Sequence, residues 1–152
     1  MSWLYKGPFS FGEVSKARLN TCDPRLIRVC YRAAQTANFS VLCGTRTDEE
    51  QHAIYADKKS TLNGVTEFSK HQLKHPINAG KTRSSAVDLM PYIPGVNVWK
   101  QRDSWMILAG VVIAAAEEEL VSIRWGGDWN MDGKSWNEKF EDLGHFELLT
   151  ET

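Results

Sequence analysis

Two short segments of the sequence each set a metal-binding side chain against apolar neighbours. In residues 86–89, Ala-Val-Asp-Leu, the alternation of a β-strand directs the valine and leucine to one face and Asp88 to the other. In residues 145–148, His-Phe-Glu-Leu, the same alternation places His145 opposite the apolar side chains. An ionised carboxylate enclosed in a domain costs several kcal/mol unless it is paired. A divalent cation would provide that compensation.

A third candidate ligand, His71, stands in a polar segment of the chain. Two imidazoles and one carboxylate match the ligand count of a catalytic zinc site, which keeps its fourth position for water. Asp142 precedes His145 by three residues, so it could lie beside that water without binding the metal, as a general base must. The residues alone leave a second interpretation open, in which both histidines are structural and hydrogen-bonded.

The order of these residues resembles the split S-x-H…A-x-D motif and the acid-x-x-His motif of a zinc peptidase family. The matching positions are Ser69, His71, Ala86 and Asp88 for the first motif, and Asp142 and His145 for the second. The family contains D-alanyl-D-alanine carboxypeptidases, D-alanyl-D-alanine dipeptidases and phage L-alanyl-D-glutamate endopeptidases, and it shares its fold with Hedgehog signalling domains. The resemblance covers about residues 20–149, and residues 125–129, Trp-Gly-Gly-Asp-Trp, also resemble the phage endolysin branch.

The resemblance implies a role for each matching side chain. It makes His71, Asp88 and His145 the ligands of one catalytic zinc ion, and Asp142 the catalytic base. Sixteen residues lie between His71 and Asp88, more than in the compact form of the motif. This insertion contains His75, which is therefore an alternative ligand.

Two further residues are similar to family positions that meet the substrate. Arg46 resembles an arginine that steadies the substrate or its developing negative charge; the alternative is a surface arginine near a helix start. Ser69 resembles a substrate-contacting residue; the alternative is an ordinary loop hydroxyl.

A second metal motif begins at residue 128. The sequence D-x-N-x-D-G-K has the start of a calcium loop, in which oxygen ligands at alternate positions surround a hard cation. The candidate Ca²⁺ ligands are Asp128, Asn130, Asp132, the backbone carbonyl of Lys134 and Glu138. Lys139 occupies the position where an acid is expected, so the motif is incomplete. A regulatory calcium site and a polar turn both remain open.

Periodicity and capping predict the elements that must position these residues. We expect helices at about 24–37, after Asp23-Pro24, at about 47–58, opened by a capping box at Thr47, and at about 104–119, capped by Asp103. Strands are expected at 39–43, 85–89, 121–125 and 145–149, with a long polar loop over 60–85. This order predicts an α+β domain with a small, mostly antiparallel sheet packed with helices. The resemblance implies a Hedgehog/D-Ala-D-Ala peptidase-like fold.

Length and composition restrict the class of protein. The chain has 152 residues, of which 42% are apolar and 24% charged, so we expect one globular domain over 1–152 without a separate wall-binding domain. Eighteen basic and nineteen acidic residues give a net charge of −1, which argues against generic nucleic-acid binding. Basic residues concentrate in 1–46 and acidic residues in 117–152. The two regions are either ordinary solvated surfaces, or a basic region that favours an anionic polymer or membrane surface and an acidic region that holds cations.

Targeting and cysteine patterns give further expectations. The longest apolar run, 105–116, is shorter than a membrane span, and the first residues lack a signal-peptide pattern. The three cysteines, Cys22, Cys30 and Cys43, show no paired spacing, and we expect reduced, buried thiols.

The resemblance then implies a function. We expect a monomeric endolysin, a zinc-dependent L-alanyl-D-glutamate endopeptidase that cleaves peptidoglycan stem peptides during host cell lysis. It would remain in the host cytoplasm until a pore made by another protein lets it reach the cell wall in the periplasm. The alternatives are a D-alanyl-D-alanine carboxypeptidase and a non-catalytic wall-binding module that keeps a structural metal. Asp142 bears on the last alternative, because a pure binding module needs no base.

Overall fold

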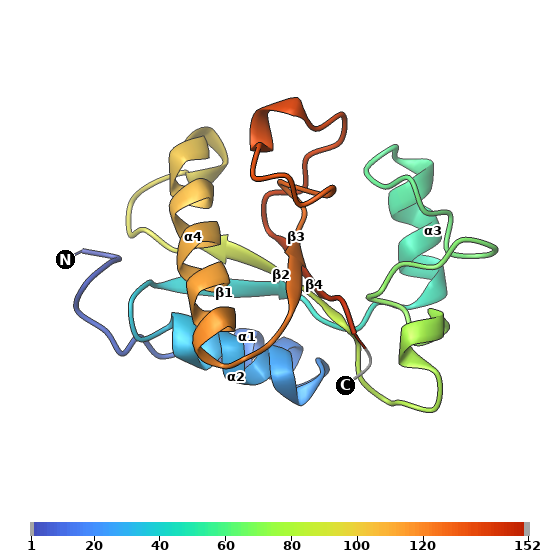
Figure 1. Cartoon of the computed structure of the whole chain (residues 1–152), viewed down its shortest axis with the longest axis horizontal. Helices are drawn as coiled ribbons and strands as arrows, with labels where there is room; N and C mark the ends of the chain where they lie inside the picture. The colour runs from blue at the N-terminus through green and yellow to red at the C-terminus, as the bar shows by residue number, and fades with distance from the viewer. Residues whose placement is uncertain (1, 151–152) are drawn as a thin grey trace.

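The computed structural model describes residues 2–150 (Figure 1). Its helices are α1 (Glu13–Leu19), α2 (Pro24–Ala33), α3 (Asp48–Ala56) and α4 (Arg102–Glu118), and its strands are β1 (Phe39–Cys43), β2 (Ala86–Pro91), β3 (Ile123–Trp125) and β4 (His145–Leu148). Short 3₁₀ turns cover Pro76–Asn78, Val98–Lys100 and Ser135–Asn137. Helices and strands mix along the chain, which confirms the predicted α+β class.

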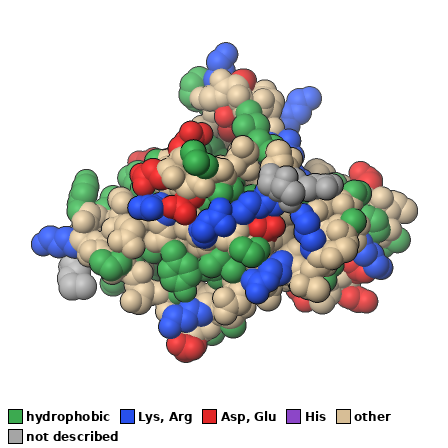
Figure 2. All heavy atoms as spheres, turned by 60° about the horizontal axis from the view of Figure 1, so that its bottom comes forward, with side chains coloured by type: hydrophobic (Ala, Val, Ile, Leu, Met, Phe, Trp, Pro, Cys, Tyr) green, Lys and Arg blue, Asp and Glu red, His purple; other side chains and the backbone are tan. Residues whose placement is uncertain are grey.

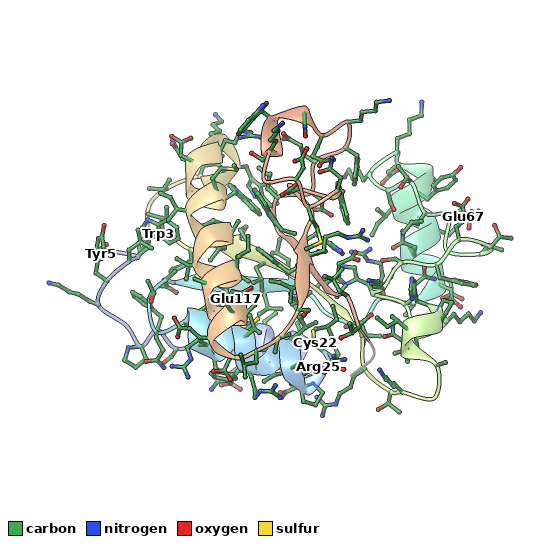
Figure 3. All side chains as sticks on the ribbon, in the orientation of Figure 1. Trp3, Tyr5, Cys22, Arg25, Glu67 and Glu117 are labelled. Carbon is green, nitrogen blue, oxygen red and sulfur yellow. The ribbon has the colours of Figure 1, made fainter. Side chains whose placement is uncertain are left out.

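The four strands form one antiparallel sheet in the order β1-β2-β4-β3. In Figure 1, α1, α2 and α4 lie together on the left, and α3 lies apart on the right, across the sheet. Figure 3 places Trp3 and Tyr5 at the left end of the molecule and Glu67, on the segment beside α3, at the right end. The sheet therefore separates the main helical layer from the segment that carries His71.

The apolar face of the sheet forms the centre of the core. Val87, Leu89, Phe146 and Leu148 are at most 1% exposed and pack in one cluster with side chains of α2 and α4. Their strand neighbours Asp88, His145 and Glu147 therefore project from the opposite face, as the alternation predicts. The described residues between 42 and 86 contribute nothing to this apolar cluster.

The helix ends follow the predicted caps in two of three cases. Asp23 accepts a hydrogen bond from the backbone N–H of Arg25, and Thr47 accepts one from that of Glu50. The helix α2 ends at Ala33, earlier than predicted, because the following carbonyls accept hydrogen bonds from the N-terminal segment, as in Phe9 N–H to Ala34 O.

The prediction that Asp103 caps α4 is wrong. Asp103 lies inside the first turn, and Gln101 precedes the helix without a side-chain cap. The Val98–Lys100 turn leads straight into the helix, so the helix starts earlier than its apolar pattern does. An acid in the first turn still interacts favourably with the helix dipole. The sequence also gave no sign of α1, which has seven residues and buries just Ser15 and Leu19.

Part of the charge asymmetry of the sequence is compensated by ion pairs between α2 and the end of α4. Arg28 and Arg32 of α2 form ion pairs with Glu118 and Glu119 at the end of α4. Figure 2 shows Lys and Arg side chains interspersed with Asp and Glu on the face turned forward. Among the described residues, no helix is long and apolar enough to cross a membrane.

Candidate active site

Three side chains from distant parts of the chain meet on the polar face of the sheet. Asp88 and His145 are cross-strand partners on β2 and β4, and His71 reaches them from the 60–85 segment. Asp88 Oδ1 lies 3.1 Å from His71 Nε2 and 3.1 Å from His145 Nδ1, and the two nitrogens are 3.2 Å apart. Atoms bound to one zinc ion at about 2.0–2.1 Å in tetrahedral geometry lie about 3.3 Å apart. The three atoms thus form one face of a zinc-sized tetrahedron.

The second nitrogen of each imidazole is bound to the protein. His71 Nδ1 lies 2.6 Å from the carbonyl oxygen of Gly44, and His145 Nε2 lies 2.9 Å from Glu147 Oε1. A carbonyl and a carboxylate can accept but not donate, so these nitrogens carry the protons. The remaining nitrogens, His71 Nε2 and His145 Nδ1, face Asp88 and offer their lone pairs to a metal once they are deprotonated.

Glu147 links the metal-facing histidine to two cations. Its Oε2 accepts from Lys70 Nζ at 2.8 Å and from Arg124 Nη2 at 2.9 Å, and the residue is 5% exposed. Burial alone would raise the pKa of Glu147, but His145 and Lys70 outweigh it and hold this pKa below its usual range. The sequence placed Glu147 on the same face as His145 but did not indicate its partners.

The second oxygen of Asp88 binds Arg46. Arg46 Nη2 lies 3.1 Å from Asp88 Oδ2, and Arg46 Nη1 donates to Gln51 of α3 at 2.6 Å. Burial acts to raise the pKa of Asp88, but the imidazoles of His71 and His145 lower it well beneath the usual range. Burial likewise acts to lower the pKa of His71, and the Asp88 carboxylate more than reverses this. The site therefore keeps Asp88 ionised.

Asp142 lies at the edge of this cluster, with a ligand atom within 4.8 Å of those of Asp88 and His145. Its Oδ2 is 4.0 Å from His145 Nδ1, and its side chain is 43% exposed. The backbone N–H of Asp142 donates to Gly126 O, and the N–H of Gly126 donates to His145 O, both at 2.8 Å. Partial burial and the nearby Asp88 carboxylate raise the pKa of Asp142 above its usual range. A carboxylate in this position can take a proton from a water at the cluster.

The structure also shows where Ser69, His75 and Cys43 lie relative to the cluster. Ser69 is 5% exposed, and its hydroxyl accepts from the backbone N–H of His71 at 3.2 Å. His75 Nδ1 accepts from the backbone N–H of Ile77, so it closes a turn, and the structure brings His71 rather than His75 to Asp88. Cys43 was expected to be a buried thiol, but it is half-buried and has a ligand atom near those of His71 and Asp88.

The cluster opens into a cleft of about 430 Å³. We call it the cationic cleft, because Arg46, Lys59, Lys70 and Arg124 line it against the acids Asp142 and Glu147. Trp129 also lines it, with its ring centroid 5.3 Å from that of His145 and the Arg124 guanidinium 5.4 Å above it.

The candidate calcium loop is a compact turn. Asp128 accepts from the backbone N–H groups of Asp132 and Gly133, and Asp132 accepts from that of Lys134. Gly133 has a φ of 80°, as the sharp turn of such a loop requires. Glu138 Oε1 is buried without a hydrogen bond, and Asn130 Nδ2 donates to Asp132. These contacts do not identify an ion, and calcium binding stays a prediction.

The chain resembles known proteins in both sequence and fold. A family model described as phage L-alanyl-D-glutamate peptidase matches residues 8–149. The L-alanyl-D-glutamate peptidase of Escherichia phage T5 is 30% identical over 146 residues, which cover 93% of this chain and 98% of that protein. The solved L-Ala D-Glu endopeptidase ChiX of Serratia marcescens matches with a TM-score of 0.66 and 26% identity, over 91% of this chain and 90% of that one. This structural match confirms the expected fold.

Proposed function

Because the chain belongs to the phage L-alanyl-D-glutamate peptidase family, we propose that it is a zinc-dependent endopeptidase for the L-alanyl-D-glutamate bond of peptidoglycan stem peptides. It is a peptidase of the phage endolysin type, as its relatives indicate. The observation that carries the zinc proposal is the triangle of ligand atoms on His71, Asp88 and His145, with Asp142 beside it.

The donor set fits zinc better than it fits a hard cation. Two neutral imidazole nitrogens and one carboxylate oxygen are typical of zinc, whereas Mg²⁺ and Ca²⁺ prefer oxygen ligands. In the proposed site, His71 Nε2, His145 Nδ1 and Asp88 Oδ1 would hold the ion. Zinc bound there supplies Lewis-acid chemistry, which polarises a carbonyl and makes a water more acidic.

The chain's own residues provide the proton transfers. Asp142 takes a proton from the attacking water and passes one to the departing amine, so that the products are an L-alanine carboxylate and a new amino terminus on D-glutamate. Arg46, which forms an ion pair with Asp88, adds positive charge next to the developing oxyanion. Ser69 holds the backbone of His71 and lines the cleft where substrate would contact it.

The charge of the cleft supports an acidic peptide as substrate. D-Glutamate in a stem peptide carries a free carboxylate next to the scissile amide. Four basic side chains line the cationic cleft against two acids, although three of the four also pair with Asp88 or Glu147. We propose that the protein binds peptidoglycan, the polymer of the bacterial cell wall, and that its role is lysis of the host cell. We also propose that the protein is synthesised in the host cytoplasm and acts in the periplasm. It would function as a monomer with a single domain.

Product analysis tests the function. Purified peptidoglycan is digested with the zinc-loaded protein and the products are identified by mass spectrometry. We expect peptides with a new amino-terminal glutamate, no products after chelation, and recovery on adding zinc. Release of D-alanine would instead identify a carboxypeptidase, and wall binding without any product would identify a non-catalytic module.

We also propose that the 128–138 loop binds Ca²⁺ and thereby orders the chain that leads to Asp142. In the turn, side-chain oxygens of Asp128 and Asn130 both accept from the backbone N–H of Asp132, and Asn130 donates to Asp132 Oδ2. With zinc held constant, raising calcium should increase the rate of hydrolysis, and Asp132→Asn should weaken this response. A rate independent of calcium would contradict the proposal.

A further inference from the structure

A second cleft, of about 490 Å³, adjoins the candidate metal centre. Asp88 and Asp142 line it where it meets the centre, and Trp99, Trp105 and Leu143 line it farther out. We call it the tryptophan cleft. Asp142 also lines the cationic cleft, so the two clefts meet at the proposed base.

The two indole rings of the tryptophan cleft form a supported platform. Trp105 is 7% exposed, and its Nε1 donates to Val98 O at 2.9 Å, which fastens the Val98–Lys100 turn to α4. Trp99 on that turn is 69% exposed, and its ring centroid lies 5.0 Å from that of Trp105. A large exposed ring beside a hollow, held by a buried neighbour, is typical of a ligand-binding surface.

The charge of the tryptophan cleft is opposite to that of its neighbour. Its basic side chain, Arg102, is neutralised by Glu141, with Nη2 and Oε1 2.7 Å apart. Asp88 and Asp142 stand at its inner end. The tryptophan cleft is lined by three acids and one base and the cationic cleft by four bases and two acids, so an anionic ligand is favoured in the cationic cleft.

The two sides of the scissile bond differ in the same way. On the D-glutamate side the stem peptide carries free carboxylates. On the L-alanine side it continues into a lactyl ether on an N-acetylated amino sugar, which is uncharged and has apolar faces. We propose that the tryptophan cleft binds this N-acetylated sugar arm and that the cationic cleft binds the acidic peptide, which fixes the direction of the substrate across the centre. This inference rests on the proposed function.

A binding experiment tests the assignment without turnover. The zinc-loaded protein is titrated with N-acetylmuramyl-L-alanine amide and, separately, with a sugar-free peptide that begins at D-glutamate. We expect Trp99→Ala to weaken binding of the muramyl ligand roughly two- to tenfold more than binding of the peptide, and Trp99→Phe to restore most of the difference. Tyr5→Ala is the control, because Tyr5 is an aromatic residue that is 84% exposed and lines neither cleft.

A kinetic experiment tests it in the reaction. The ratio of kcat/KM for a muramyl-bearing substrate to that for the sugar-free stem peptide should fall with Trp99→Ala and stay constant with Tyr5→Ala. Equal losses on both substrates, or no loss on either, would overturn the proposal. If the parent protein cleaves neither substrate, the proposed function fails, and the binding titration still decides on its own whether the cleft takes the sugar.

Discussion

The imidazole of His145 is fixed from both of its nitrogens. Nδ1 faces Asp88 and His71, and Nε2 donates to Glu147, whose charge is shared with Lys70 and Arg124. Such a carboxylate makes the ring a better metal ligand and sets its orientation. We therefore infer that Glu147 is a positioning residue, which would act on the proposed metal through His145.

We expect Glu147→Gln to weaken zinc binding about 10- to 100-fold, because it removes the negative charge behind His145 while keeping an acceptor in place. Competition with a chromogenic chelator measures this affinity. Glu67→Gln, an exposed acid at the far end of the molecule, is the control and should leave the affinity unchanged. Equal affinities in all three proteins would show that Glu147 serves packing alone.

Asp142→Asn should keep the fold and the zinc content but lower hydrolysis by roughly 10²- to 10⁴-fold, because the amide cannot accept a proton from water. Elemental analysis and the rate on peptidoglycan are measured on the same sample. Asp57→Asn, on an exposed helix end, is the control. An Asp142→Asn protein that still lyses walls at the parent rate would exclude Asp142 as the base.

At this scale the sequence predicted which side chains meet but not what surrounds them. Strand alternation put Asp88 and His145 on the polar face, and the family resemblance indicated His71 and Asp142. The sequence did not reveal the contacts of Glu147 with Lys70 or of Arg46 with Asp88, because these residues are far apart in the chain. Such pairs depend on strand register and on how loops return to the sheet.

Among the secondary-structure elements, the least predictable was the segment over 60–85. Its polar composition predicted a long loop, yet buried amides tie it down. Gln51 of α3 donates to Ser60 and Leu62 O, and Gln72 donates to Gly64 O. Apolar periodicity finds core-facing helices and strands, and it cannot detect a segment ordered by side-chain amides.

The Gly126 turn between β3 and the 128–138 loop sets the position of Asp142. A Cβ on Gly126 would overlap the carbonyl of Asp142 and press on His145. Gly126→Ala should therefore cost about 1–3 kcal/mol of folding stability and displace the base enough to lower the rate up to about 100-fold.

Thermal unfolding and hydrolysis rates measure the two effects of Gly126→Ala. Gly110→Ala is the matched control, because a Cβ on that α4 residue meets nothing within 4 Å. An unchanged rate in Gly126→Ala would mean that the Asp142 backbone tolerates the shift.

At the scale of the whole molecule, the three proposed metal ligands come from two parts of the chain that are stabilised in different ways. Asp88 and His145 belong to strands anchored in the apolar cluster, whereas His71 belongs to the 42–86 stretch, whose described residues stay out of it. A metal bound by all three would cross-link that stretch to the sheet and oppose its local opening.

Removing the metal should therefore speed trypsin cleavage at the exposed residues Lys58 and Lys74, by up to about 100-fold relative to protein with zinc at 100 times its Kd. Mass spectrometry of the fragments measures the rates. Cleavage at Lys6 in the N-terminal arm is the internal reference and should not change. Identical cleavage at Lys58 and Lys74 with and without zinc would exclude the cross-link.

The meeting of two clefts at Asp142 has a mechanical consequence. An active site that is open on two sides can bind a polymer chain at an interior position and does not require a free chain end. In peptidoglycan, the proposed substrate, stem peptides in the interior of the polymer would then be accessible as well as those at its ends. If the protein cleaves peptidoglycan as proposed, its cuts can therefore fall throughout the polymer and are not restricted to the ends of chains.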